Sequence, residues 1–130
     1  FMALVMEGDT SMDYWVKAIT QKGLYQVRDD LLGTCKFGGL SQKMALAALQ
    51  VEGNLDISFE DMMAAVRRAY LRGLAIERKQ GYDYSEYTLP EQVFEQPNRN
   101  VQTEPFVTRE FFAELQEKVW AVFNKEIEAL

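Results

Sequence analysis

Apolar side chains recur at helical spacing in several stretches of the chain, and no stretch alternates between apolar and polar residues as a half-buried strand would. The first helical stretch follows Ser11, a residue type that caps helix N-termini, and it ends at Gly23. The second follows Ser41 and stops at Gly53. These patterns predict two amphipathic helices, and the apolar stripe of the second consists of Met44, Ala45, Ala48 and Leu49.

The clearest pattern begins at Ser58, which is predicted to form a capping box with Asp61, and it runs to Arg78 or Lys79. We expect its apolar face, rich in methionine and aromatic residues, to lie in the core rather than to hold a cofactor. Gly73 interrupts this helix at a cost of about 1 kcal/mol relative to Ala, or else marks a place where another backbone approaches. The side chains predicted to face solvent are Glu60, Arg67, Arg68 and Arg72.

Thr108 begins the last predicted helix, whose apolar residues form one wide face. Burial contributes about 1.5–3 kcal/mol per large side chain, so this face can anchor the helix to the domain or to a partner. Residues 24–30 predict a short connector, and residues 80–107, with three prolines, predict a long irregular loop with one helical turn after Pro90. The sequence therefore predicts an all-α, multihelical fold. The residues of the last apolar face are Phe112, Leu115, Val119, Trp120, Phe123, Ile127 and Leu130.

The composition is typical of one soluble globular domain spanning residues 1–130, with 48% hydrophobic and 26% charged residues. A net charge of −6 argues against a nucleic-acid partner, because phosphate binding needs clustered Lys and Arg. Residues 1–6 are apolar but too short to span a membrane. One cysteine excludes an internal disulfide, and the lack of a secretory leader leads us to expect a reducing cytoplasm. The absence of histidine excludes hydrolytic triads and histidine-ligated zinc in this chain.

Candidate chemistry is concentrated in residues 29–37, where the cysteine follows a carboxylate and a glycine. Asp30 can accept hydrogen bonds from a bound heterocycle, and Gly33 allows positive φ and close approach of the backbone to a ligand. Cys35 is either a soft thiolate ligand or, beside several apolar neighbours, a small buried hydrophobe. Paired carboxylates elsewhere, such as Glu110 with Glu114, are interpreted as solvated charges, and no catalytic residue is predicted.

The chain carries four short motifs, at residues 30–37, 75–78, 81–82 and 89–91. Together they resemble the C-terminal part of the aldehyde ferredoxin oxidoreductase family, whose members are tungsten or molybdenum pterin enzymes. The resemblance extends from about Leu24 to Glu91. At one position, Thr34, this sequence has threonine where the family usually has leucine, which puts the local packing against the pterin in question. The residues that carry the resemblance are Asp30, Gly33, Thr34, Cys35, Lys36 and Phe37, then Ala75, Ile76, Glu77 and Arg78, then Gly81, Tyr82, Leu89, Pro90 and Glu91.

The resemblance implies that Asp30, Gly33 and Thr34 contact a tungsten- or molybdenum-bis-pterin, and that Cys35 is the last of four ligands to a four-iron, four-sulfur (4Fe-4S) cluster. The implied reaction is oxidation of an aldehyde to a carboxylic acid, with water as oxygen source and a ferredoxin-like electron acceptor. The implied partners are the remainder of a larger parent polypeptide and that acceptor, without a membrane.

One cysteine cannot hold a cluster that needs four thiolates, so the other ligands are expected from outside this chain. We therefore expect the chain to be a fragment of the larger oxidoreductase that is inactive and retains no cofactor when isolated. The alternative is a stand-alone helical scaffold or interaction domain, which has the family fold without redox chemistry and acts through its apolar C-terminal helix.

Overall fold

The described part of the chain is helical throughout. The computed structural model describes residues 11–35, 38, 41–82, 86–95 and 107–130, and these contain no strand. The all-α prediction is confirmed. The elements are α2 (Met12–Lys17), the π-helix η1 (Ala18–Lys22), α3 (Leu24–Leu31), α4 (Gln42–Val51), α5 (Phe59–Lys79), α6 (Gln92–Glu95) and α7 (Arg109–Ile127).

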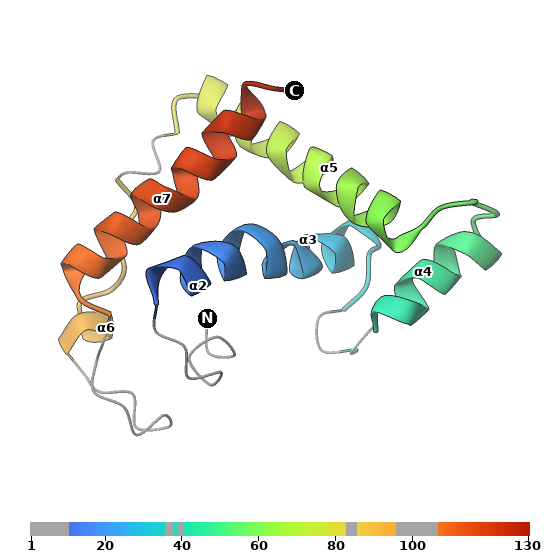
Figure 1. The fold of residues 1–130 in the computed structure, drawn as a ribbon, viewed down its shortest axis with the longest axis horizontal. Coiled ribbons are helices and arrows are strands. Elements are labelled where there is room, and N and C mark those ends of the chain that lie inside the picture. Colours follow the sequence, from blue (N-terminus) through green and yellow to red (C-terminus); the bar gives the residue numbers. More distant parts are fainter. Residues whose placement is uncertain (1–10, 36–37, 39–40, 83–85, 96–106) are drawn as a thin grey trace.

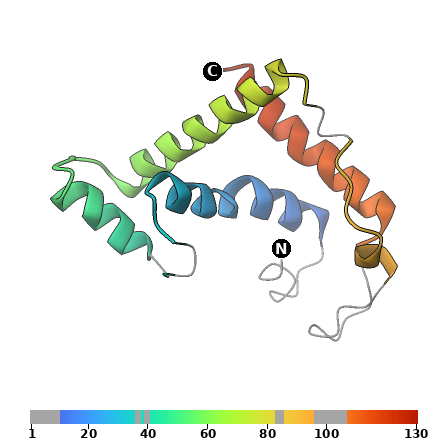
Figure 2. The ribbon, with the colours of Figure 1, turned by 180° about the vertical axis from the view of Figure 1, so that it is seen from behind.

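Three helical rods form the body of the molecule. Figure 1 shows α5 and α7 meeting in a V, with the nearly continuous segment α2–η1–α3 lying across its open side. The α2 end of this segment packs on α7 and the α3 end packs on α5, while α5 and α7 pack on each other. Helix α4 stands beside this body, next to the start of α5, as the reverse view in Figure 2 also shows. None of the described helices combines the length and apolar character needed to cross a membrane.

The core lies where the three rods meet. Trp15 is fully buried there, and its ring meets that of Phe111 edge to face, with centroids 6.5 Å apart and an interplanar angle of 87°. Helix α7 buries Leu115, Val119 and Phe123 in this core, so of the two alternatives this face anchors to the domain. Leu130, also expected on this face, lies beyond the helix and is exposed. The other buried members of the cluster are Leu71, Leu74, Leu115, Val119 and Phe123.

The predicted helix starts are correct. Each hydroxyl at an N-cap accepts a hydrogen bond from the backbone N–H three residues later, at 3.1–3.3 Å. The capping box is reciprocal, because the Ser58 N–H also donates to Asp61 Oδ2 at 3.0 Å. The Ser58 hydroxyl also donates to Asp61 Oδ2 at 2.7 Å, and this bond, together with the one from the Ser58 N–H, lowers the pKa of the Asp61 carboxyl. The capping residues are Ser11, Ser41, Ser58 and Thr108.

Residues 86–95 of the predicted loop pack along α7. Gln116 Nε2 donates to the Tyr87 carbonyl at 2.8 Å, and Arg109 forms an ion pair with Glu91. The Arg109 guanidinium also lies 4.8 Å from the centroid of the Phe94 ring. The predicted helical turn after Pro90 is α6, while residues 83–85 and 96–106 lie outside the described residues.

The connector predicted for residues 24–30 is wrong, because this segment is helix α3. Gly23 does not stop the chain there, since its φ of −57° and ψ of −27° are helical and lead directly from η1 into α3. Leu24 and Arg28, one turn apart, are both buried. Packing of α3 on α5 therefore stabilises a helix that has no side-chain cap of its own.

In α5 one expectation is wrong and one alternative is excluded. Arg67, expected to face solvent, has only 26% of its side chain exposed and bonds to two other elements, whereas Arg68 and Arg72 are exposed as predicted. At Gly73, a Cβ would meet no atom within 4 Å, so no other part of the described chain approaches its backbone there.

Candidate functional site

The residues predicted to contact cofactors lie together in the turn that ends α3. Gly33 has a φ of +66°, in the left-handed region that glycine tolerates best. Its N–H donates to the Asp30 carbonyl at 3.1 Å, and the Thr34 N–H donates to the Asp29 carbonyl at 2.9 Å. This pair of bonds defines a Schellman motif, which stops the helix and turns the chain away from its axis.

The side chains of this turn differ in how far they are already engaged. Asp30 is exposed, and its Oδ1 accepts a hydrogen bond of 3.0 Å from Gln26 Nε2, one helical turn earlier. Thr34 is half-buried and donates its hydroxyl to the Asp29 carbonyl at 3.1 Å. Gly33 has open space where a side chain would stand. Asp30 and Gly33 are therefore accessible to a ligand, whereas Thr34 mainly secures the helix end.

Cys35 follows this turn as an exposed free thiol. The alternative in which it is a small buried hydrophobe is therefore wrong. Its carbonyl accepts a hydrogen bond from the Gly38 N–H at 2.8 Å, while Lys36 and Phe37 lie outside the described residues. Within the described ranges, no three thiol or carboxyl groups are placed to hold a metal ion. Cys35 can accordingly supply one ligand to a set that other residues must complete.

A buried arginine supports the turn and was not singled out from the sequence. Arg28 is only 3% exposed, and its Nε donates to Asp29 Oδ1 at 2.8 Å. Its guanidinium lies 5.6 Å from the centroid of the Tyr25 ring. The signal in the sequence was an arginine placed directly before two aspartates, in a segment that was not recognised as helical.

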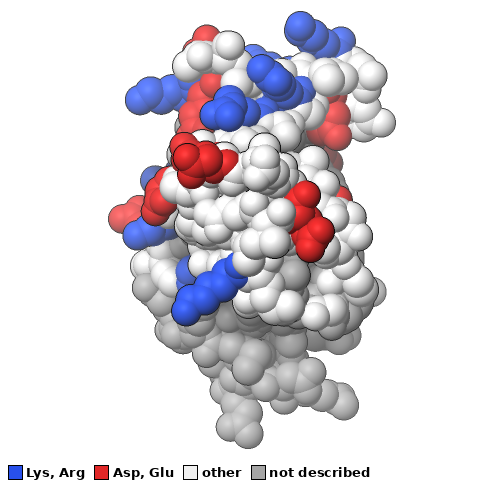
Figure 3. All heavy atoms as spheres, turned by 90° about the vertical axis from the view of Figure 1, so that its right-hand side faces the viewer, with Lys and Arg blue, Asp and Glu red and all other residues white. Residues whose placement is uncertain are grey.

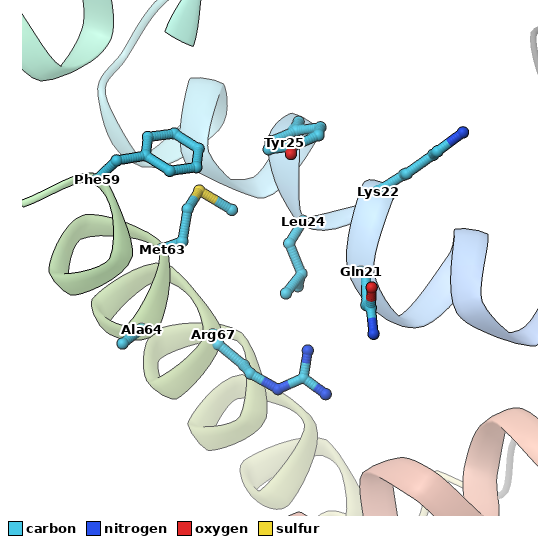
Figure 4. A pocket seen from close by; sticks show the side chains of 8 residues that line it. All are labelled: Gln21, Lys22, Leu24, Tyr25, Phe59, Met63, Ala64 and Arg67. Carbon is cyan, nitrogen blue, oxygen red and sulfur yellow. The ribbon is translucent and has the colours of Figure 1, made fainter. Parts of the chain in front are cut away.

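Two open hollows flank the contact between α3 and α5. The first, of about 460 Å³, lies between η1, α3 and α5; Figure 4 shows Phe59, Met63 and Leu24 on its apolar side, and Gln21 and Arg67 towards its polar end. The second, of about 440 Å³, lies between α3, α5 and α7. Its lining includes Val27, Leu31, Tyr70, Leu74 and Trp120.

Arg67 at the end of the first hollow joins three elements. Its Nε and one terminal nitrogen donate to the two carboxylate oxygens of Glu126 at 2.6 and 2.5 Å, and the other terminal nitrogen donates to the Thr20 carbonyl at 2.7 Å. These hydrogen bonds from Arg67 are the main reason that the pKa of Glu126 is lowered. Since Arg67 is already paired with Glu126, it does not offer a free positive charge to a ligand in the hollow.

The Thr20 carbonyl belongs to the π-helix η1. Widening of the helix at η1 lets the Gly23 N–H donate to the Ala18 carbonyl, five residues earlier, at 3.0 Å. The Thr20 hydroxyl donates back to the Val16 carbonyl at 2.8 Å. The guanidinium of Arg67 on α5 thus donates to a backbone carbonyl at a place where the regular α-helical hydrogen-bond pattern is interrupted.

Comparison of the chain with protein-family models, with curated proteins and with solved structures finds no match. The arrangement at the end of α3 therefore has to be interpreted from its own chemistry. It offers an exposed carboxylate, an open glycine and an exposed thiol within six consecutive residues, 30–35.

Proposed function

We propose that this chain is the C-terminal helical part of a tungsten- or molybdenum-pterin, iron–sulfur oxidoreductase that oxidises aldehydes to carboxylic acids and transfers the electrons to a ferredoxin-like acceptor. The observation that carries the proposal is the turn after α3, which holds Asp30, Gly33 and Cys35 accessible at the surface. These residue types, in this order along the chain, match the motif of the family that the sequence resembles. A reducing cytoplasm suits both the single free thiol and an iron–sulfur protein.

The exposed thiol fits a shared cluster better than a site within the chain. Thiolate sulfur is the ligand that iron–sulfur clusters use, and a 4Fe-4S cluster normally takes four of them. Cys35 supplies one and is exposed, so ligands from another segment can approach it. The remainder of the parent polypeptide is the proposed source of the other three.

The neighbouring residues fit an edge of the metallopterin. The Asp30 carboxylate has acceptor capacity beyond its single bond to Gln26, which suits the N–H groups of a pterin. Gly33 leaves space for a flat heterocycle against the backbone. When bound, the metallopterin supplies the redox chemistry, and the residues of this chain bind and orient it.

The cluster part of the proposal is tested by Cys35→Ser in the full-length polypeptide. We expect the substituted protein to lose iron and the visible absorbance of the cluster, because an alkoxide or hydroxyl is a poor substitute for thiolate. Cys35→Ala should behave in the same way. Retention of the full iron content with unchanged absorbance would show that Cys35 is not a ligand.

The pterin part is tested by Asp30→Asn, with Asp56→Asn as the matched control on another exposed aspartate. The first substitution removes a negative charge and one acceptor at the proposed pterin edge, so the protein should bind less tungsten or molybdenum and less pterin. The control should leave both contents unchanged. Equal metal contents in the two variants would count against a role for Asp30.

The second candidate function is a stand-alone helical interaction domain. The sequence suggested this function because the C-terminal helix has a wide apolar face, but much of that face on α7 lies in the domain core. An exposed apolar stripe on α4 keeps the candidate open, since Met44 and Val51 are 59% and 75% exposed. The reading frame discriminates between the two: several hundred upstream residues with three closely spaced cysteines favour the enzyme, and a short free-standing frame favours the scaffold.

A further inference from the structure

The hollow of about 440 Å³ between α3, α5 and α7 has the size and lining of a small-molecule site. It is here called the aromatic hollow, because the side chains of Tyr70 and Trp120 line it. Small-molecule sites are typically concavities of about 300–1,000 Å³ with a mostly apolar lining and few polar groups. Val27, Leu31 and Leu74 supply further apolar surface here. The aromatic hollow is therefore large enough to hold a small organic molecule.

The two aromatic side chains of the hollow are held in place by the core. Tyr70 belongs to α5 and Trp120 to α7, and both rings pack against the buried ring of Phe123. The centroids lie 5.5 and 5.8 Å from that of Phe123, with interplanar angles of 72° and 60°. Rings that are fixed in advance lose little conformational entropy when a ligand binds. Because the faces of phenol and indole rings attract cations, this pair favours a positively charged ligand.

The charge of the hollow has the same preference. Of the described residues that line it, only Glu77 is charged. Burial, and in addition the negative charge of Glu77, raise the pKa of Tyr70, so this charge acts on groups inside the hollow. Glu77 also interacts within the chain, but a carboxylate has about four acceptor positions, so it can accept from a ligand as well. On the outer face in Figure 3, by contrast, acidic and basic side chains lie next to each other.

The α5 and α3 sides of the hollow are open to a ligand. Gly73 lies within the 21-residue helix α5, where glycine is less favourable than alanine. A Cβ at this position would meet no atom within 4 Å, so packing of the described chain does not require a glycine there, and the space beside it is free. On the α3 side, Leu31 is 57% exposed. A ligand in the hollow would cover this apolar side chain.

From these features we propose that the aromatic hollow binds an organic ammonium ion, which is a positively charged amino group on an apolar arm. The arm lies against Leu31 and Leu74, and the ammonium group lies at the two rings, within reach of Glu77. Burial of the arm supplies affinity, while the rings and the carboxylate select for positive charge. The inference does not depend on the proposed redox function, because it uses no cofactor and no residue from outside the chain.

The test titrates the 130-residue chain with three probes of similar shape and different charge. Phenethylammonium is the cation, phenethyl alcohol the neutral analogue and hydrocinnamate the anion. The probes are small, so we expect dissociation constants in the millimolar range, which nuclear magnetic resonance titrations can measure. The cation should bind at least about fivefold more tightly than the alcohol, and the anion should bind least. Equal affinity for the cation and the alcohol would overturn the inference.

The two tryptophans of the chain provide an internal control in the same spectra. Trp120 lines the hollow, whereas Trp15 is fully buried in the core. The indole N–H signal of Trp120 should therefore shift with the cation until it saturates, and that of Trp15 should stay in place. Shifts of equal size at both indoles, or shifts that do not saturate, would show that the probe does not select the hollow.

Two substitutions separate the charge of the hollow from its space. Glu77→Gln should weaken the cation at least about fivefold and change the affinity for the alcohol by less than about twofold. Glu52→Gln, at an exposed glutamate outside the lining, is the matched control and should change neither. Gly73→Leu should abolish binding of the cation and the alcohol, because it fills the hollow with a side chain that favours the helix.

The outcomes of these substitutions decide the proposal. Loss of cation selectivity in Glu77→Gln alone, with loss of binding in Gly73→Leu, supports it. Equal effects of Glu77→Gln and Glu52→Gln overturn it, because the negative charge of the hollow then plays no part. Undiminished binding to Gly73→Leu also overturns it, since the probe must then lie elsewhere. Circular dichroism of each variant should show the helical content of the unsubstituted chain.

Discussion

Replacing Arg67 by Ala should destabilise the domain by separating α5 from both α7 and η1. The substitution removes two hydrogen bonds to the Glu126 carboxylate and one to the Thr20 carbonyl. These partners are 59 and 47 residues away in the sequence, so the guanidinium connects elements that are otherwise joined mainly by apolar packing. The neighbouring Arg72 is exposed and provides a matched control.

The expected loss follows from the exposure of the groups involved. A buried hydrogen bond to a charged group contributes about 1.5–3 kcal/mol, whereas an exposed ion pair contributes about 0–1 kcal/mol. Arg67 and Glu126 lie between these limits, with 26% and 33% of their side chains exposed. The substitution removes this ion pair and the hydrogen bond to the Thr20 carbonyl together. We therefore expect Arg67→Ala to lower the free energy of unfolding by about 2–3 kcal/mol, out of a typical total of about 5–15 kcal/mol.

Urea denaturation at pH 7, followed by circular dichroism, measures this loss. Arg72→Ala should change the unfolding free energy by less than about 0.5 kcal/mol. Arg67→Lys should fall between the wild type and Arg67→Ala, because an ammonium group cannot donate to both carboxylate oxygens as a planar fork does. A double-mutant cycle with Glu126→Ala should give a coupling of about 1 kcal/mol. If Arg67→Ala costs no more than Arg72→Ala, the interpretation of Arg67 as a connection between the helices is wrong.

The same ion pair predicts how stability changes with pH. Arg67 holds the pKa of Glu126 below its usual value of about 4.5, so the unfolded chain binds this proton more tightly than the folded one. The contribution is fully present above about pH 4.5 and is lost as the pH falls through the lowered pKa of the folded state. Stability should therefore fall more steeply in this range for the wild type than for Arg67→Ala, and equal slopes would contradict the assignment.

Three further predictions concern the core, a helix cap and the candidate ligand. Trp15→Ala should cost about 3–5 kcal/mol in urea denaturation, and Trp120→Ala clearly less, because only the first ring is fully buried; a larger loss at Trp120 would contradict this order. Ser58→Ala should cost about 1 kcal/mol and fray the start of α5 in hydrogen exchange. Cys35 in the native isolated chain should react with a thiol reagent nearly as fast as in the unfolded chain, since it is exposed; labelling only after unfolding would show that it is protected.

The sequence alone determined where most helices begin, because these signals are local. At each N-cap, a hydroxyl bonds to an N–H three residues away, so the interaction needs nothing from the rest of the fold. The clustering of Asp30, Gly33 and Cys35 was likewise contained in the sequence, since they are neighbours in one turn. The end of α3 at that turn depends on Gly33, whose positive φ is also a local property.

Only the tertiary structure decided which surfaces are covered. Helix α3 lacks a side-chain cap and is stabilised by packing on α5, so its sequence resembled a connector. Arg67 sat where the helical period predicted solvent, but a carboxylate 59 residues later pairs with it. Met44 and Ala45 belong to one predicted apolar stripe on α4, but Ala45 is buried and Met44 is exposed, because the packing of α4 on α5 covers only part of the helix. Burial depends on segments far apart in the chain, whereas caps and turns depend on a few consecutive residues.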